Sequence, residues 1–83
     1  MMSAEQQFEV VKSFLIDFDG VCRDKNVNVV MIKVSPLLYA CLRIAEELEF
    51  IDGEVYCRGY AMKVEPKWEH IQYTYEVTNS DSE

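Results

Sequence analysis

The chain has few of the residues that mark special environments. Among its 83 residues are three glycines, two prolines and one histidine. It has no uninterrupted apolar stretch of about 20 residues, the length that a membrane-spanning helix needs. The polar start, Met1–Gln7, lacks the apolar segment of a signal peptide. We therefore expect a cytoplasmic protein that does not enter a membrane.

Basic residues are scarce as well. Eight Lys and Arg stand against 15 Asp and Glu, which gives a net charge of −7. Nucleic-acid binding and attraction to anionic lipid both need clustered Lys and Arg. We therefore expect no direct contact with nucleic acid or membrane. The acidic balance permits a basic protein partner, and it is equally explained by solubility alone.

The cysteines do not form a metal-binding pattern. Cys22, Cys41 and Cys57 are odd in number and widely spaced, with no C-x-x-C pair, and His70 is not close to any of them in sequence. This spacing is unlike that of a zinc site. We expect reduced thiols, no bound metal and no cofactor.

The length is sufficient for one domain, which we place at residues 1–77, and residues 78–83 are expected to form a disordered acidic tail. The hydrophobic fraction of 49% is high for such a small body. Either the core is crowded, or part of the apolar surface is used in a homodimer or with another protein.

Two helices are predicted. Ser3 and Gln6 form an S-x-x-Q capping box that begins a helix over residues 3–18, and Gly20 is expected to end it. A short strand over residues 13–18 is the alternative. The expected buried stripe of this helix consists of residues at helical spacing: Phe8, Val11, Leu15 and Phe18, with Phe14 beside them.

The second helix is predicted to begin with Ser35 as N-cap and Pro36 at the first helical position, and to end near Glu47. Its expected buried face is made of Leu37, Cys41, Ile44, Ala45 and Leu48, widened by Leu38 and Leu42.

The remaining segments favour strands. Residues 27–34 are apolar on both faces and predict a central strand. Asp52-Gly53 is typical of a hairpin turn between residues 48–51 and 54–58. Arg58-Gly59 is either a bulge in one bent strand, 54–65, or a turn between two strands. Residues 68–77 alternate as a half-buried antiparallel strand does.

The order of these elements predicts the α+β class. We expect a small antiparallel or mixed sheet of three to four strands, with the two helices packed on one face.

The segment Asp17-Phe18-Asp19-Gly20-Val21 resembles the first motif of the haloacid dehalogenase-like phosphatases. The resemblance implies Asp17 as nucleophile and Asp19 as general acid and base, with Mg²⁺ neutralising both. We interpret the match as coincidental, because that fold needs well over about 100 residues and the later motifs are missing. A Mg²⁺-dependent phosphatase-like enzyme remains the alternative, as does a divalent-cation site that adds Asp24.

A second resemblance covers about half of the chain. Ser35-Pro36-Leu37-Leu38-Tyr39, followed by residues 57–66 with the letters CRGYAMKVEP, looks like a pattern found in small uncharacterised bacteriophage proteins. It implies a phage accessory or host-takeover protein acting in the host cytoplasm.

Two sets of residues are candidate contacts for a partner. An acidic set around the end of the second helix would meet a basic protein, unless it is only a solvated helix end. An aromatic set would anchor an interface, unless Trp68 covers a sheet edge. The acidic set is Glu46, Glu47, Glu49, Asp52 and Glu54, and the aromatic set is Trp68, His70 and Tyr60.

These observations lead to one functional hypothesis. We expect a small acidic protein-binding domain without catalytic residues, a homodimer, and an accessory protein or inhibitor of a host protein if it is phage-encoded. A structural subunit of a larger assembly is a further alternative.

Overall fold

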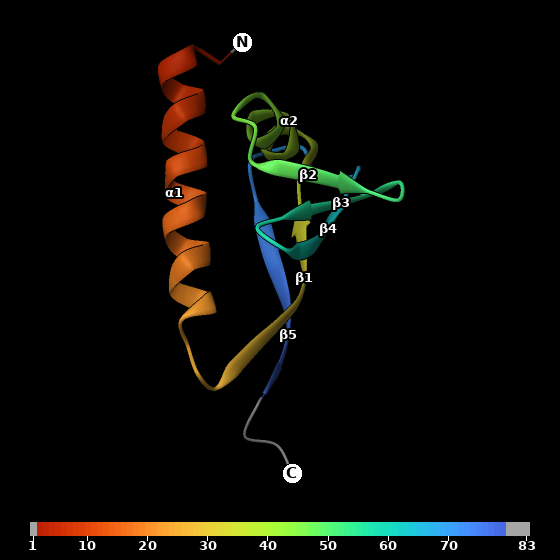
Figure 1. Cartoon of the computed structure of the whole chain (residues 1–83). Coiled ribbons are helices and arrows are strands. Elements are labelled where there is room, and N and C mark those ends of the chain that lie inside the picture. Colours follow the sequence, from red (N-terminus) through yellow and green to blue (C-terminus); the bar gives the residue numbers. More distant parts are fainter. Residues whose placement is uncertain (1, 80–83) are drawn as a thin grey trace.

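Two helices and five strands make up the described part of the chain, residues 2–79, in the computed structural model (Figure 1). In chain order they are α1 (Ala4–Cys22), β1 (Val27–Val34), α2 (Pro36–Ile44), β2 (Leu48–Ile51), β3 (Glu54–Cys57), β4 (Tyr60–Val64) and β5 (Tyr73–Asn79).

The strands form one mixed sheet in the order β2-β3-β4-β1-β5. β1 and β4 are parallel, and the other neighbouring pairs are antiparallel. β1 therefore has a partner on both sides, as its apolar sequence predicted. A β-bulge between Val29 and Met31 shifts the register of β1 by one residue. Val29 and Ile32 therefore face the same side of the sheet, which is the side of the helices.

Both helices pack on the same face of this sheet, and the predicted α+β class is confirmed (Figure 1). The core combines residues from both helices and from three strands: Val11, Phe14, Phe18, Ile32, Val34, Leu38, Cys41, Leu42, Cys57 and Met62. The opposite face of the sheet carries Lys33 on β1 and Lys63 on β4, which stand side by side in register.

The number of strands exceeds the predicted three to four because Arg58-Gly59 is a turn and not a bulge. Arg58 has φ 53° and Gly59 φ 87°, while Asp52 has φ 52° and Gly53 φ 82°. Positive φ at both central residues is typical of the type I′ turn, whose twist suits a two-residue hairpin. Two such turns in succession fold β2, β3 and β4 into a meander.

Helix α1 begins as predicted but ends later. The Gln6 N–H donates to the Ser3 hydroxyl at 3.1 Å and the Ser3 N–H donates to Gln6 Oε1 at 2.9 Å, which completes the capping box. The prediction that Gly20 ends the helix is wrong. The helix continues to Cys22, because the Arg23 N–H still reaches the Asp19 carbonyl at 3.1 Å and Phe18 packs in the core. These contacts outweigh the cost of about 1 kcal/mol for an interior glycine.

Helix α2 begins at the predicted cap but is shorter and differently rotated. The Ser35 hydroxyl accepts from the Leu38 N–H at 3.3 Å, and the helix ends at Ile44, before Glu46 adopts a left-handed φ of 61°. Leu38 and Leu42 are fully buried, whereas Leu37 and Ile44, which were expected in the core, are exposed.

The predicted strand over residues 68–77 is also wrong in its first half, since β5 begins only at Tyr73. The preceding residues cross the end of β1 to reach its far side. The Ser35 hydroxyl holds this connection by accepting from the Gln72 N–H at 3.2 Å, and the Ser35 N–H donates to the Gln72 carbonyl at 3.0 Å. Trp68 and His70 therefore lie in a connection and not on a strand.

At its other end β5 continues to Asn79, beyond the predicted limit of Val77. Residues 80–83 of the predicted tail lie outside the described residues. Between residues 2 and 79, neither helix combines the length and the hydropathy needed to cross a bilayer.

Candidate functional site

The most exposed large apolar side chains of the described residues lie around one groove. Ile44 is 66% exposed, and Phe8 and Ile16 are each 64% exposed. Phe8 and Ile16 line the groove itself, and Ile44 lines an adjoining hollow that shares Phe8, Val11 and Ala45 with it. Apolar surface that gathers in this way usually marks a binding surface.

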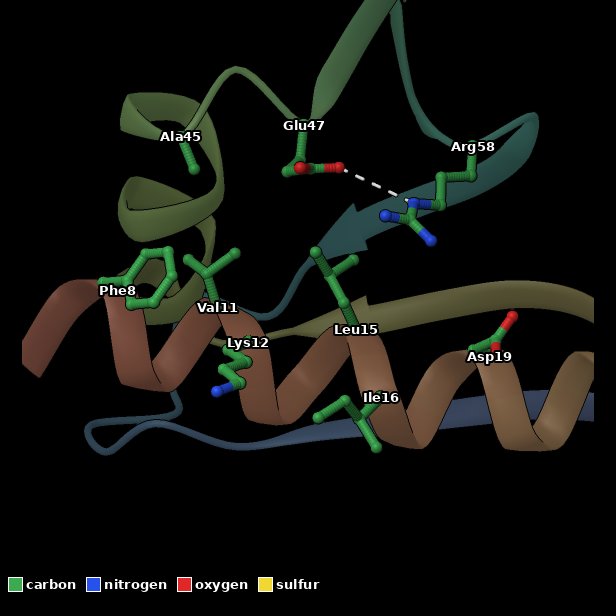
Figure 2. Close-up of a pocket in the computed structure, with 9 residues that line it drawn as sticks. All are labelled: Phe8, Val11, Lys12, Leu15, Ile16, Asp19, Ala45, Glu47 and Arg58. Carbon is green, nitrogen blue, oxygen red and sulfur yellow. Dashed lines mark ion pairs between the residues drawn. The ribbon is translucent and has the colours of Figure 1, made fainter.

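This α1 groove has a volume of about 730 Å³ and runs along α1. Figure 2 shows Phe8, Val11 and Leu15 rising from the helix into it, while Ile16 lies at its outer edge. Its opposite wall comes from the end of α2 and from the β3–β4 turn. The lining residues are Phe8, Val11, Lys12, Leu15, Ile16, Asp19, Ala45, Glu47 and Arg58.

The opposite wall is held by an ion pair. Arg58 Nε lies 3.6 Å from Glu47 Oε1, which joins the β3–β4 turn to the segment that follows α2 (Figure 2). Arg58 belongs to the β3–β4 turn, where it has a left-handed φ, and its side chain lines the groove. With Lys12 and Asp19 on the α1 side, the lining carries two positive and two negative charges, although the chain as a whole has a net charge of −7.

The other side of α1 is closed by aromatic side chains from β5. The rings of Phe14 and Tyr73 meet edge to face at 4.9 Å, and those of Phe18 and Tyr75 stack at 5.8 Å. The Tyr75 hydroxyl donates to Asp17 Oδ2 at 2.9 Å. Burial, followed by this hydrogen bond and the Asp17 charge, raises the pKa of Tyr75 far above its usual range.

Asp17 and Asp19, the two acids of the phosphatase-like motif, do not converge. Both stand on one continuous helix, where residues two apart point about 200° away from each other. Asp17 faces Tyr75, whereas Asp19 lines the α1 groove and pairs with Arg23 at 3.0 Å. Between residues 2 and 79, no three Asp, Glu, His or Cys side chains could hold a metal ion together, so the possible cation site with Asp24 is not formed.

The five acids of the predicted patch are divided between different surfaces. Glu47 faces the α1 groove and Arg58. Glu49 pairs with Tyr56 across β2 and β3, on the sheet face opposite to that of Leu48 and Cys57. Glu54 shares that uncovered face, Asp52 occupies the hairpin turn, and Glu46 follows α2.

The predicted aromatic set is not brought together either. Tyr60 begins β4 and packs edge to face on Phe18, with ring centres 5.3 Å apart, on the helix side of the sheet. Trp68 and His70 follow the other end of β4, where Trp68 is half-buried and His70 is exposed. Tyr60 therefore belongs to the margin of the core.

Sequence reasoning did not identify the α1 groove. Phe8 was assigned to the buried stripe of the first helix, and Ile44 to that of the second. One signal was present: Ile16 lies off the buried stripe and next to Lys12 at helical spacing, so it extends an apolar surface beyond the core-facing side.

No family model matches the chain, and neither a curated protein nor a solved structure is significantly similar to it, so the site is interpreted from its geometry alone.

Proposed function

We propose that the chain is a small acidic, non-enzymatic protein-binding domain and that the α1 groove is its binding surface. The observation that carries the proposal is the position of Phe8, Ile16 and Ile44, the three most exposed large apolar side chains described, around that one groove. Fully burying a side chain of this size contributes about 1.5–3 kcal/mol, so covering all three would support a stable complex.

The surrounding charge suits this role. The lining of the α1 groove is balanced in charge, and it therefore provides short-range contacts of both signs. Glu49 and Glu54 lie elsewhere on the surface and contribute to the long-range field of an acidic protein. Such a field accelerates the approach of a basic partner without taking part in the contact.

The partner class to test follows from residues 35–39 and 57–66, which resemble a pattern of small bacteriophage proteins. A phage accessory protein or inhibitor would bind a protein of the bacterial cytoplasm. Tagged chain would be used to capture proteins from a bacterial extract, with the original sequence beside the groove variant Phe8→Ser/Ile16→Ser. We expect a captured protein that the groove variant fails to retain.

The matched control is Val30→Ser, which removes an apolar side chain that is 50% exposed on β1, away from the α1 groove. It should retain the captured protein as the original chain does. If the groove variant, shown to be folded by circular dichroism, captures the same proteins as the original, the α1 groove is not the binding surface.

A further inference from the structure

We infer that the partner that fits the α1 groove is helix α1 of a second copy of this chain, lying antiparallel across it. The inference rests on the proposed function, because it concerns the same surface: a second copy covers the α1 groove in the protein alone, and a bacterial partner would displace that copy. It is carried by the order of charges along α1, which is complementary to itself when the helix is reversed.

The exposed stripe of α1, which consists of Phe8, Lys12, Leu15, Ile16 and Asp19, carries charges at matching distances from its centre. Lys12 and Asp19 both line the α1 groove, and they stand at equal distances in sequence from the step between Leu15 and Ile16. A two-fold axis through that step places Lys12 of each copy opposite Asp19 of the other. The same patch on both copies is what a two-fold interface requires.

The apolar residues fit the same register. Leu15 of each copy lies opposite Ile16 of the other at the axis, where both side chains would be the most fully covered. Phe8 then lies opposite Arg23 of the second copy, an arrangement that favours a cation–π contact. Phe8 and Ile16 would lose their exposure together, and no pair of like charges is opposed.

Charge balance allows two acidic copies to approach at this surface. Two molecules of net charge −7 repel each other as a whole. Within the α1 groove itself, however, Asp19 and Glu47 are matched in number by Lys12 and Arg58. Lys12 forms no ion pair within residues 2–79, so it is available to the second copy.

Charge reversal tests the register directly. Lys12→Glu and Asp19→Lys would each be prepared, and the mass of the species in solution would be measured by sedimentation equilibrium across a concentration series at about 0.15 M salt. Each single variant opposes two pairs of like charges, so we expect its dimer dissociation constant to rise at least about tenfold. An equal mixture of the two variants restores both opposite-charge pairs, and we expect heterodimers with nearly the original affinity.

The outcomes separate this inference from the proposed function. The antiparallel register is supported if the original chain dimerises, each single variant weakens the dimer, and the mixture of the two variants restores it. An original chain that stays monomeric overturns the inference, as do single variants that dimerise unchanged or a mixture that stays monomeric. A monomeric chain whose Phe8→Ser/Ile16→Ser variant loses a captured bacterial protein would leave the proposed function standing without the dimer.

Discussion

The two sides of helix α1 carry similar apolar residues, but those on one side are buried, whereas Phe8 and Ile16 on the other side are open to solvent. On one side, Phe14 and Phe18 are buried against aromatic rings of β5, and the Tyr75 hydroxyl joins that strand to Asp17. On the other side, Phe8 and Ile16 are mostly exposed along an open groove, with Ile16 at its outer edge. Hydrophobic type alone therefore does not decide burial in this fold. The neighbouring elements do, since β5 covers one side of the helix, whereas on the other side the end of α2 and the β3–β4 turn leave an open groove.

This difference separates stability from recognition. Contacts on the closed side are made within the chain and contribute to folding. Apolar side chains on the open side contribute little until a partner covers them. The following predictions test that division, from the largest expected effect to the smallest.

Phe18→Ala should lower the free energy of unfolding by about 3–5 kcal/mol, because it leaves a cavity beneath Tyr60 and Tyr75. Phe8→Ala, on the open side of the same helix, should change it by less than about 0.5 kcal/mol. Urea denaturation followed by circular dichroism measures both. Equal losses for the two variants would remove the distinction between the two sides.

Alkaline pH should destabilise the fold, because buried thiol and phenol groups have raised pKa values. Burial, followed by the Glu47 charge, raises the pKa of Cys57 from its ordinary value of 9.0 to about 11. The unfolded chain then loses this proton first, so the contribution is complete below pH 9 and is lost as pH rises toward 11, at about 1.4 kcal/mol per unit. On the closed side, the raised pKa of Tyr75 adds a loss that begins near pH 10.

Melting temperatures recorded between pH 7 and pH 11 would show this decline. Cys57→Ala should make the slope between pH 9 and pH 11 shallower, although buried Cys41, whose pKa is also raised by burial, still contributes to it. An unchanged slope in this variant would show that Cys57 keeps an ordinary pKa in the folded chain.

Removing the tyrosine–aspartate hydrogen bond should have an intermediate effect. Tyr75→Phe keeps the ring against Phe18 and deletes only the donor to Asp17, with an expected loss of about 1 kcal/mol. Asp19→Asn weakens the exposed pair with Arg23 and should cost at most about 0.5 kcal/mol. Thermal unfolding at neutral pH ranks the two. If Asp19→Asn is the more damaging, the open side contributes more to folding than the geometry indicates.

The smallest effect on stability is expected in the α1 groove itself. Ile16→Ser should leave the free energy of unfolding within about 0.5 kcal/mol of the original, because the side chain is already mostly in water. The same change should abolish binding at that surface. A large loss of stability in dilute, monomeric protein would show that Ile16 serves the core.

Local signals in the sequence were sufficient for much of the fold. Ser3 with Gln6, Ser35 with Pro36, and Asp52 with Gly53 each determine a helix start or a turn through contacts among near neighbours, and all three predictions are confirmed. Such features depend little on the rest of the chain.

Features that depend on distant neighbours were not predictable in the same way. Apolar residues surround most of α2, so periodicity could not decide that Leu38 and Leu42 face the core while Ile44 faces water. The residues before β5 alternate in the sequence as a strand does. Their place in a connection follows only from the need to cross the end of β1. The α1 groove was missed for the same reason, because Arg58 reaches it from a turn far along the chain.

The pairing of β1 with β5 has a consequence for the order in which the chain can fold. β1 is an early strand, yet one of its two partners, Tyr73–Asn79, is the last element of the described chain (Figure 1). During synthesis on the ribosome, the aromatic side of α1 thus stays exposed to solvent until β5 has been synthesised. Contacts between segments so far apart slow the folding search. In a nascent chain, both sides of α1 are therefore open at first, and the arrival of β5 distinguishes them.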